Sequence, residues 1–362
     1  LSLQDALNNT NGLIAHGSDG QLQAASLNNH GGQWLHSGTG SLVLQADSID
    51  NSQGVLASNG QLQLTSQQLD NGAGQVQGAS AQIETGQLNN QAGVLTGQSL
   101  LTVNAGDIDN RGGEVSGGAL HLNGAGLLND GGKLVGINGT DITLSGVLDN
   151  GQGQVLSGGD AHLTAGGLHN GAQGLIQLSS TGNLALDISG QLDNAGEISS
   201  LGQLALTAQS LSNSGLVAAN DAMSLVGDIE NSGQLSASQL HVSGSHFDNS
   251  GQVSAGQSLL LDSDAIVNQG HIESAGTGQI STAQLDNSQG EIVVLGISDI
   301  DAGTLSNRSG LIHGGEGLNV TADIADNQGG HLQSAGAVSL SGGSLDNQGG
   351  QILSGSQLTV QN

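Results

Sequence analysis

Short runs of alternating apolar and polar residues recur along the whole chain, separated by corners rich in Gly, Asn and Ser. In one representative unit, the tripeptide 49–51 (IDN) precedes a glycine-containing corner, an apolar position at Leu56, and the apolar pair Leu62 and Leu64. The tripeptide 69–71 (LDN) then starts the cycle again. Because successive side chains of a strand point to opposite faces, this spacing predicts short β-strands with one buried face.

The apolar-x-Asn tripeptide repeats eighteen times at intervals of 18 to 24 residues, with its asparagine at Asn9, Asn29, Asn51, Asn71, Asn90, Asn110, Asn129, Asn150, Asn170, Asn194, Asn213, Asn231, Asn249, Asn268, Asn287, Asn307, Asn327 and Asn347. Strands this short cannot form a stable isolated sheet, but stacked coils can bury their apolar residues against one another. Parallel crossovers are strongly right-handed. The sequence therefore predicts an all-β, right-handed parallel β-helix of about eighteen coils, each with roughly 20 residues and three short strands.

The asparagine of each tripeptide has a structural role in this prediction. A side-chain amide at an inward corner can donate a hydrogen bond to one coil and accept one from the next. A column of aspartates in the same place would stack like charges. We therefore expect the eighteen asparagines to form a structural ladder rather than a catalytic site.

Residues 1–362 are interpreted as one repeat array. Most corners have the spacing Asn-x-x-Gly, whereas from Asn194 to Asn268 the spacing is Asn-x-Gly, which defines a sub-block (194–268) with shorter corner turns. The longest unit, between Asn170 and Asn194, is expected to form an extra loop around Leu178–Asn183. The sequence begins and ends in the same phase of the repeat, so we expect a segment of a longer filament, without caps.

The charge balance excludes several classes of partner. The formal net charge is −28, with only Arg111, Lys133 and Arg308 as Lys or Arg residues, so neither nucleic acid nor an anionic membrane surface is an expected partner. No apolar run approaches the length of a transmembrane helix, so membrane insertion by this segment is not expected. There are no cysteines, and neither a disulfide framework nor a cofactor is predicted.

Units such as LDNGAGQVQG, LNNQAGVLTG, IDNRGGEVSG and LDNQGGQILSG resemble the repeats of filamentous haemagglutinin-type exoproteins, and the resemblance covers essentially the whole sequence. These are the secreted partners of two-partner secretion systems in Gram-negative bacteria, and include adhesins and contact-dependent growth-inhibition toxins. The resemblance implies a filament exported unfolded through an outer-membrane transporter and located at the cell surface. The family's N-terminal secretion domain and, for toxins, its C-terminal effector domain are not in this sequence, so the branch stays open.

The position before the repeated asparagine is acidic in ten units, at Asp50, Asp70, Asp109, Asp149, Asp193, Glu230, Asp248, Asp286, Asp326 and Asp346. Carboxylates of adjacent coils would lie about 5 Å apart and could share a cation. The simpler interpretation is a solvated face that keeps the protein soluble. The glycine-rich nonapeptide of calcium-binding β-rolls is absent, so no metal site is predicted.

Two other carboxylate pairs, Asp262 with Asp264 and Asp299 with Asp301, have the spacing of acid and base groups on one side of a strand. A glycan-active enzyme acting on acidic sugars also needs cations, and none lies near these pairs in the sequence. We therefore predict that the protein is not an enzyme.

The remaining candidates are aromatic, histidine and aliphatic residues. His30 and His36 flank Trp34, and His241 and His246 precede Phe247; without a third ligand these are weak metal signals, and both aromatic side chains are expected inside the core. The run Ile292, Val293, Val294 and Leu295 breaks the alternation and leaves one or two apolar side chains outside, so it is the candidate contact patch.

Three functional classes remain. The leading hypothesis is a structural filament or stalk that presents an adhesive or toxin element. The second is an adhesin segment whose exposed β face binds a receptor or glycan on a target bacterium or host cell. A β-helical glycan-active enzyme has the least support. Uniform outward composition favours the stalk, whereas a cluster of non-repeating polar residues would favour binding or catalysis.

Overall fold

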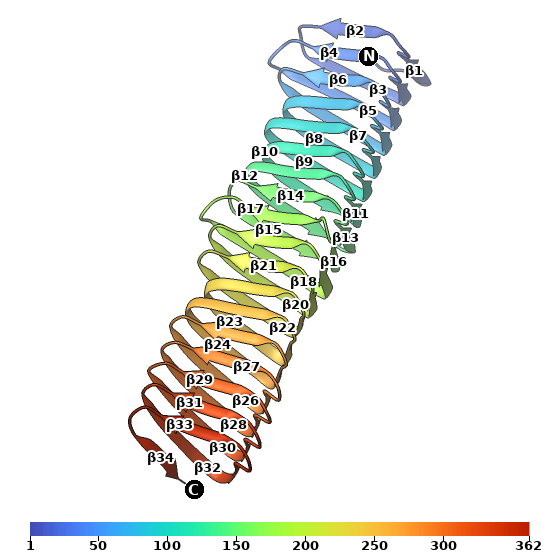
Figure 1. Ribbon diagram of the computed structural model, residues 1–362. Helices are drawn as coiled ribbons and strands as arrows, with labels where there is room; N and C mark the ends of the chain where they lie inside the picture. Colours follow the sequence, from blue (N-terminus) through green and yellow to red (C-terminus); the bar gives the residue numbers. More distant parts are fainter. Residues whose placement is uncertain (362) are drawn as a thin grey trace. The chain divides into compact units, whose positions relative to one another are not determined.

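The computed structural model describes residues 1–361, which form two compact units, Leu1–Gly190 and a second that begins at Gln191. Both units are built from β-strands joined by short corners, and in each unit a strand pairs in parallel with the equivalent strand one coil along the chain (Figure 1). The register joins equivalent repeat positions, as in the pairing of Leu42 with Leu62 and of Ile300 with Val320. The predicted parallel β-helix is confirmed, and each unit contributes nine of the eighteen repeated asparagines.

The first unit contains β1 (Ala6–Asn8), β2 (Leu13–His16), β3 (Gly20–Asn28), β4 (Gln33–His36), β5 (Ser41–Asp50), β6 (Val55–Ser58), β7 (Gln61–Asp70), β8 (Gln75–Asn89), β9 (Val94–Asp109), β10 (Glu114–Gly124), β11 (Gly126–Leu128), β12 (Lys133–Leu144), β13 (Val147–Asp149), β14 (Gln154–Ser157), β15 (Ala161–Ala165), β16 (Gly167–Asn170) and β17 (Leu175–Leu178). β18 (Asn183–Asn194) begins in the first unit and ends in the second.

The second unit continues with β19 (Glu197–Ser200), β20 (Gln203–Asn213), β21 (Leu216–Ala219), β22 (Ala222–Asn231), β23 (Gln234–Asn249), β24 (Gln252–Asn268), β25 (His271–Ser274), β26 (Thr277–Asp286), β27 (Glu291–Val294), β28 (Ile297–Ser306), β29 (Leu311–Gly314), β30 (Gly317–Asp326), β31 (His331–Ser334), β32 (Ala337–Asp346), β33 (Gln351–Ser354) and β34 (Leu358–Gln361).

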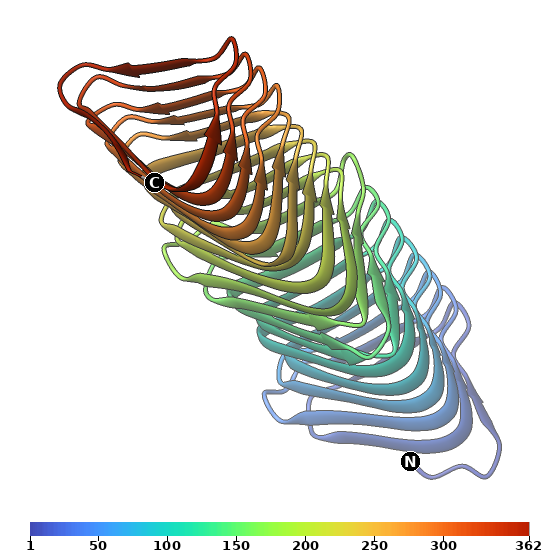
Figure 2. The same cartoon turned by 90° about the horizontal axis from the view of Figure 1, so that it is seen from below.

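The three predicted strand segments of a coil lie on three sides, but two of them are usually one continuous strand. β7 contains both the apolar pair Leu62 and Leu64 and the following tripeptide residue Leu69, whereas the four-residue β6 follows the corner. The parallel pairing of β5 with β7 is interrupted for two residues between the pair and the tripeptide and then resumes in the same register. Within each unit, successive coils follow nearly the same path, as the view in Figure 2 shows.

A narrow aliphatic core fills each coil. Leu56, Leu62, Leu64 and Leu69 are all buried within one turn of the repeat, and most equivalent positions of the two adjacent coils are Leu, Ile or Val, with Trp34 next to Leu56 and Ala81 next to Leu62. Burying one such side chain contributes about 1.5–3 kcal/mol, and every added coil extends the stack. Apolar residues on a period of two therefore stabilise a fold that has almost no aromatic side chains.

The shorter corners expected in 194–268 change the backbone pairing of the second unit. There the strands β20, β22, β23 and β24 run through the repeated asparagine, whereas elsewhere most strands end one residue before it. In a short corner the N–H of Gly215, two residues after Asn213, donates back to the carbonyl of Asn194 at 3.1 Å. In a longer corner the N–H of Gln53, two residues after Asn51, donates forward to the carbonyl of Gly72 at 2.9 Å. The shorter corner thus reverses the direction of this backbone hydrogen bond between coils.

The extra loop expected near 178–183 is present at residues 179–182, between β17 and β18. It is anchored by the hydroxyl of Ser179, which donates to the carbonyl of Ser157 at 3.1 Å. The N–H of Asn183 donates to the Asp160 carboxylate at 2.9 Å. The insertion therefore adds residues at a corner without interrupting the stack of β15 on β18.

Candidate functional site

The repeated asparagines form a continuous hydrogen-bonded ladder within each unit. In each link, Nδ2 of one asparagine donates to Oδ1 of the next at 2.7–2.8 Å, from Asn9 to Asn170 in the first unit and from Asn194 to Asn347 in the second. Each unit therefore contains eight such links. Asn51, for example, accepts from Asn29 of the preceding coil and donates to Asn71 of the next.

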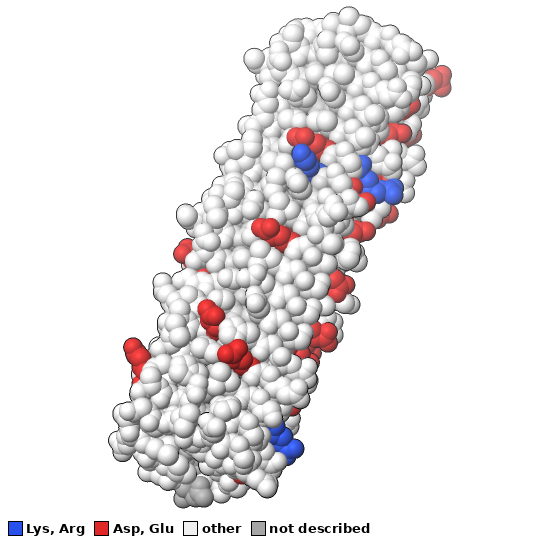
Figure 3. Space-filling model, in the orientation of Figure 1, with Lys and Arg blue, Asp and Glu red and all other residues white. Residues whose placement is uncertain are grey.

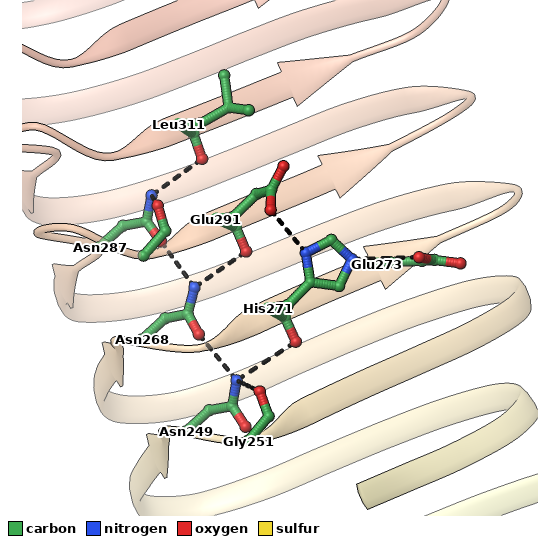
Figure 4. A network of polar contacts seen from close by, with 9 residues as sticks. Asn249, Gly251, Asn268, His271, Glu273, Asn287, Glu291 and Leu311 are labelled. Atoms are coloured by element: carbon green, nitrogen blue, oxygen red, sulfur yellow. Dashed lines mark hydrogen bonds and ion pairs between the residues drawn. The ribbon is translucent and has the colours of Figure 1, made fainter.

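The second Nδ2 hydrogen of each ladder asparagine satisfies backbone carbonyls. Asn268 donates to the carbonyl of Glu291 at 3.1 Å, and Asn287 donates to that of Leu311 at 3.1 Å (Figure 4). Most ladder asparagines also approach a carbonyl of their own corner, as Asn287 does with Gly290 at 3.3 Å. The column is buried, so an aspartate in it would lose these donors and add charge in a place without cations. This explains why the amide is retained.

The glycine that closes each corner is required by the ladder. A side chain at Gly113 would collide with the carbonyl of Asn90 and the amide of Asn110, and Gly310 has the same relation to Asn287 and Asn307. In the short corners of the second unit, a side chain at Gly233 would instead collide with the carbonyl of Gly215. The corner glycine of each repeat therefore packs directly against the neighbouring backbone, and in the longer corners also against the ladder asparagines.

Residues two positions after the ladder asparagine adopt the left-handed conformation in most of the longer corners. Several of them are not glycine: Asn11, Gln53, Ala73, Ala92, Gln289 and Ser309 have φ between 53° and 66°. A residue with a Cβ is strained there by about 1 kcal/mol, and glycine occupies this position at Gly31, Gly112, Gly131, Gly329 and Gly349. The corner thus tolerates side chains at a cost in stability.

The position before each ladder asparagine, here called the cap position, was interpreted from the sequence as a solvated acidic face. The structure gives it a further role. In longer corners its side chain accepts a hydrogen bond from the backbone N–H two residues on, as Asp70 does from Gly72 at 2.9 Å and Asp286 from Ser288 at 2.9 Å. Asp and Asn form such turns readily, and that preference is the signal that would have revealed the role.

Hydrogen bonding at the cap position also affects ionisation. The side chain of Gln328 and the backbone N–H of Gln348 lower the pKa of Asp346 from its ordinary value. The guanidinium of Arg111 lowers the pKa of Asp109 by a hydrogen bond, and burial opposes this. These contacts favour the carboxylate form. They occupy carboxylate oxygens that a shared cation would need.

Acidic side chains lie in small groups on the face drawn in Figure 3, and much of that face is uncharged. Among residues 1–361, no group of three or more His, Asp or Glu side chains is arranged to hold a metal ion. The two candidate acid–base pairs are exposed, and Asp299 accepts a hydrogen bond from Asn319 at 2.7 Å. The pairs therefore lie on open β surface.

The aromatic side chains lie inside, as expected. Trp34 is 4% exposed and Phe247 is fully buried. The indole Nε1 of Trp34 donates to Nε2 of His16 at 3.1 Å, and the His16 ring stacks on His36 at 5.0 Å between centroids. Nδ1 of His36 also forms a hydrogen bond with the Ser58 hydroxyl at 2.8 Å. His16 and His36 therefore pack at the edge of the core beside Trp34.

One histidine bridges two carboxylates on the surface of the second unit. The imidazole of His271 contacts Glu291 through Nδ1 at 3.0 Å and Glu273 through Nε2 at 3.1 Å (Figure 4). Partial burial lowers the pKa of His271, but hydrogen bonds and charge attraction from Glu273 and Glu291 outweigh this and raise it above the ordinary value. The sequence analysis did not find this cluster, because Glu291 is placed beside His271 only by the register of β25 and β27, although Glu273 lies on the same strand as His271.

The candidate contact patch is divided between core and surface. Ile292 and Val294 are buried, Val293 is half-buried, and Leu295 is 56% exposed. Val294 points inward because Gly278 of the preceding coil leaves room for it, and a side chain at Gly278 would collide with Val294. The exposed apolar surface at this place therefore consists of Leu295 together with Ile297, which the sequence analysis did not include.

Within residues 1–361 no helix is long and apolar enough to cross a membrane. The fold and the ladder define a parallel β-solenoid in which one asparagine and one glycine per coil fix the corner. The haemagglutinin repeat model matches this sequence in seven overlapping segments, at residues 1–39, 37–112, 78–152, 135–196, 178–244, 228–309 and 296–362. The chain belongs to the haemagglutinin repeat family.

Membership confirms the resemblance seen in the repeat units. Haemagglutinin repeats in a β-solenoid indicate a filament segment of a secreted, surface-associated protein of the adhesin type. Comparison with the curated proteins gives no match, and comparison with the solved structures gives none either.

Proposed function

We propose that this chain is a stalk segment of a large bacterial surface exoprotein, and that it presents an adhesive or toxin element to a target cell. The ladder is the observation that carries this proposal. Each coil is joined to the next by parallel backbone pairing, by an asparagine link and by aliphatic packing. A repeat held at every coil in this way resists extension and keeps a distal element away from the surface.

The outward positions are consistent with a spacer. Their side chains are mostly small or polar, and many of the acidic ones are occupied in capping the corners. The described residues contain no three-ligand metal cluster, and the candidate acid–base pairs are exposed on β surface. The proposed stalk function is non-enzymatic.

Export through an outer-membrane transporter of the two-partner type is the secretion route that we infer from the family. The chain has no cysteine and no proline, so neither disulfide formation nor slow prolyl isomerisation would delay folding outside the cell. The partner expected for secretion is therefore that transporter. The Gram-negative cell surface is the expected location.

A receptor-binding role is the second candidate, and the exposed side chains of Leu295 and Ile297 favour it. The experiment that separates the two roles measures binding of the purified segment to intact bacteria and to epithelial cells. The spacer function predicts no saturable binding to either. Saturable binding that is lost when 194–268 or 292–295 is replaced by standard repeats would overturn the spacer function and identify a receptor-binding module.

A further inference from the structure

The first unit has a surface hollow at one unusual coil. Its volume is about 560 Å³, and it is lined by residues of β8, β9, β11 and β13, including Asp107, Gly126, Leu128 and Val147. A hollow of this volume is within the range of small ligand sites. Neither the asparagine ladder nor the stalk function proposed above requires this hollow.

Two departures from the repeat produce the hollow. Gly126 stands in an outward column between Asp107 and Val147, so that coil has no side chain there. In the next outward column, Leu128 occupies the cap position between Asp109 and Asp149, where every other residue of the first unit is Asn, Asp or His. Leu128 cannot accept the corner hydrogen bond and is 42% exposed.

The hollow combines apolar surface with an uncompensated acid. Val147 is 54% exposed beside Leu128, and the buried side chains of Ile108 and Leu127 lie beneath. On the rim, Asp109 is paired with Arg111 at 2.6 Å. By contrast, the Asp107 carboxylate forms no hydrogen bond or ion pair with any residue of 1–361 and lies at the open edge of the hollow.

We propose that this hollow binds a polypeptide segment of a partner protein that presents an apolar side chain next to a Lys or Arg. The apolar side chain would lie over Gly126 against Leu128 and Val147, and its cationic neighbour would pair with Asp107. Charge complementarity supports this occupant, because the acidic rim and the net charge of −28 repel nucleic acid and anionic lipid. A polyamine would leave the apolar lining uncovered, and no exposed aromatic ring is present for stacking on a sugar.

The test uses the whole chain with methyl-labelled Leu and Val, observed by NMR, and three dipeptide probes. These are acetyl-Phe-Lys-amide, acetyl-Phe-Glu-amide and acetyl-Ala-Lys-amide, each added to about 10 mM because a site this small binds weakly. The methyl signals of Leu128 and Val147 are expected to shift saturably with the Phe-Lys probe. Binding of the Phe-Glu and Ala-Lys probes is expected to be about fivefold weaker or more.

Substitutions test whether the NMR shifts arise from binding in the hollow. A side chain at Gly126 would meet no atom closer than 3.7 Å, so Gly126→Val fills the hollow without strain and is expected to abolish the shift at Val147. Leu128→Asp restores the residue typical of the cap position and is expected to abolish binding too. Gly317→Val is the matched control, because that strand glycine also has open space and lies in the other unit. Its binding is expected to equal that of the unsubstituted chain.

Three results would overturn the proposal. They are an absence of saturable shifts with the Phe-Lys probe, equal binding of the Phe-Lys and Phe-Glu probes, and unchanged binding in Gly126→Val. Circular dichroism of each variant establishes that it is folded. Because Leu128→Asp introduces the residue already found at the cap positions of the two adjacent coils, Asp109 and Asp149, it keeps the test decisive if Gly126→Val fails to fold.

Discussion

Nδ2 of Asn110 donates a hydrogen bond to Oδ1 of Asn129 at 2.8 Å, and both side chains are fully buried. Nδ2 of Asn123 on β10 donates to Oδ1 of Asn104 on the neighbouring strand β9, also at 2.8 Å, but this link lies on the exposed surface. The two links have the same chemistry and differ in burial. This difference separates the structural ladder from ordinary surface contacts.

Asn110→Ala is expected to destabilise the first unit by about 2 kcal/mol or more. The substitution leaves Oδ1 of Asn129 and two carbonyl groups without their buried donor. Asn123→Ala is the control and is expected to change the free energy of unfolding by less than about 0.5 kcal/mol. Urea denaturation followed by circular dichroism measures both. Equal effects of the two substitutions would show that the ladder has no special role.

Ala92→Gly is expected to stabilise the protein by about 0.5–1 kcal/mol, because Ala92 has φ of 53° and glycine adopts this conformation without strain. The same substitution at Ala105, within the extended strand β9, is expected to destabilise by a similar amount. Thermal denaturation of the two variants provides the comparison. A destabilised Ala92→Gly variant would contradict the strain assigned to the corner.

Asp286→Ala is expected to destabilise its corner by up to about 1 kcal/mol, since the N–H of Ser288 loses its acceptor. Asp248→Ala is the matched control, because Asp248 precedes a short corner and its carboxylate accepts no hydrogen bond from residues 1–361. Hydrogen exchange at the amide of residue 288 is the local readout. If exchange there is as slow in Asp286→Ala as in the unsubstituted chain, the capping role is wrong.

His271 is expected to titrate above the ordinary histidine pKa in the folded protein, because Glu273 and Glu291 stabilise its charged form. A raised folded-state pKa stabilises the protein fully below the unfolded-state pKa, and this contribution is lost as pH rises through the folded-state value. The stability difference between the unsubstituted chain and His271→Gln should therefore shrink with rising pH. NMR titration of the imidazole gives the pKa directly, and Glu291→Gln should lower it. A pKa at or below the ordinary value would contradict the assignment.

The sequence predicted the repeat, the parallel β-helix and the direction of the asparagine side chains, because all three depend on spacing along the chain. The short corners of 194–268 and the loop before Asn183 were also visible as changes of spacing. The bridge from His271 to Glu291 and the fit of Val294 against Gly278 were not, since each depends on which residues the register places in adjacent coils. The candidate patch was only partly located for the same reason: without Gly278, Val294 could not be assigned to the core.

The hollow at Gly126 is a surface feature that also depends on which residues the register places in adjacent coils. Leu128 is recognisable in the sequence as an apolar residue at a cap position, but its exposed neighbour Val147 lies one coil away. Only the parallel register shows that the missing side chain of Gly126 stands between Asp107 and Val147. Repeat sequences therefore give their architecture readily, whereas sites on their outer faces require the pairing of coils.

Single-molecule pulling on the two ends of the chain tests the central claim, that the laddered coils form a mechanical spacer. The spacer account predicts discrete unfolding events at high force, with the force of an early event lowered by Asn110→Ala and unchanged by Asn123→Ala. Smooth extension at low force, or equal effects of the two substitutions, would contradict it.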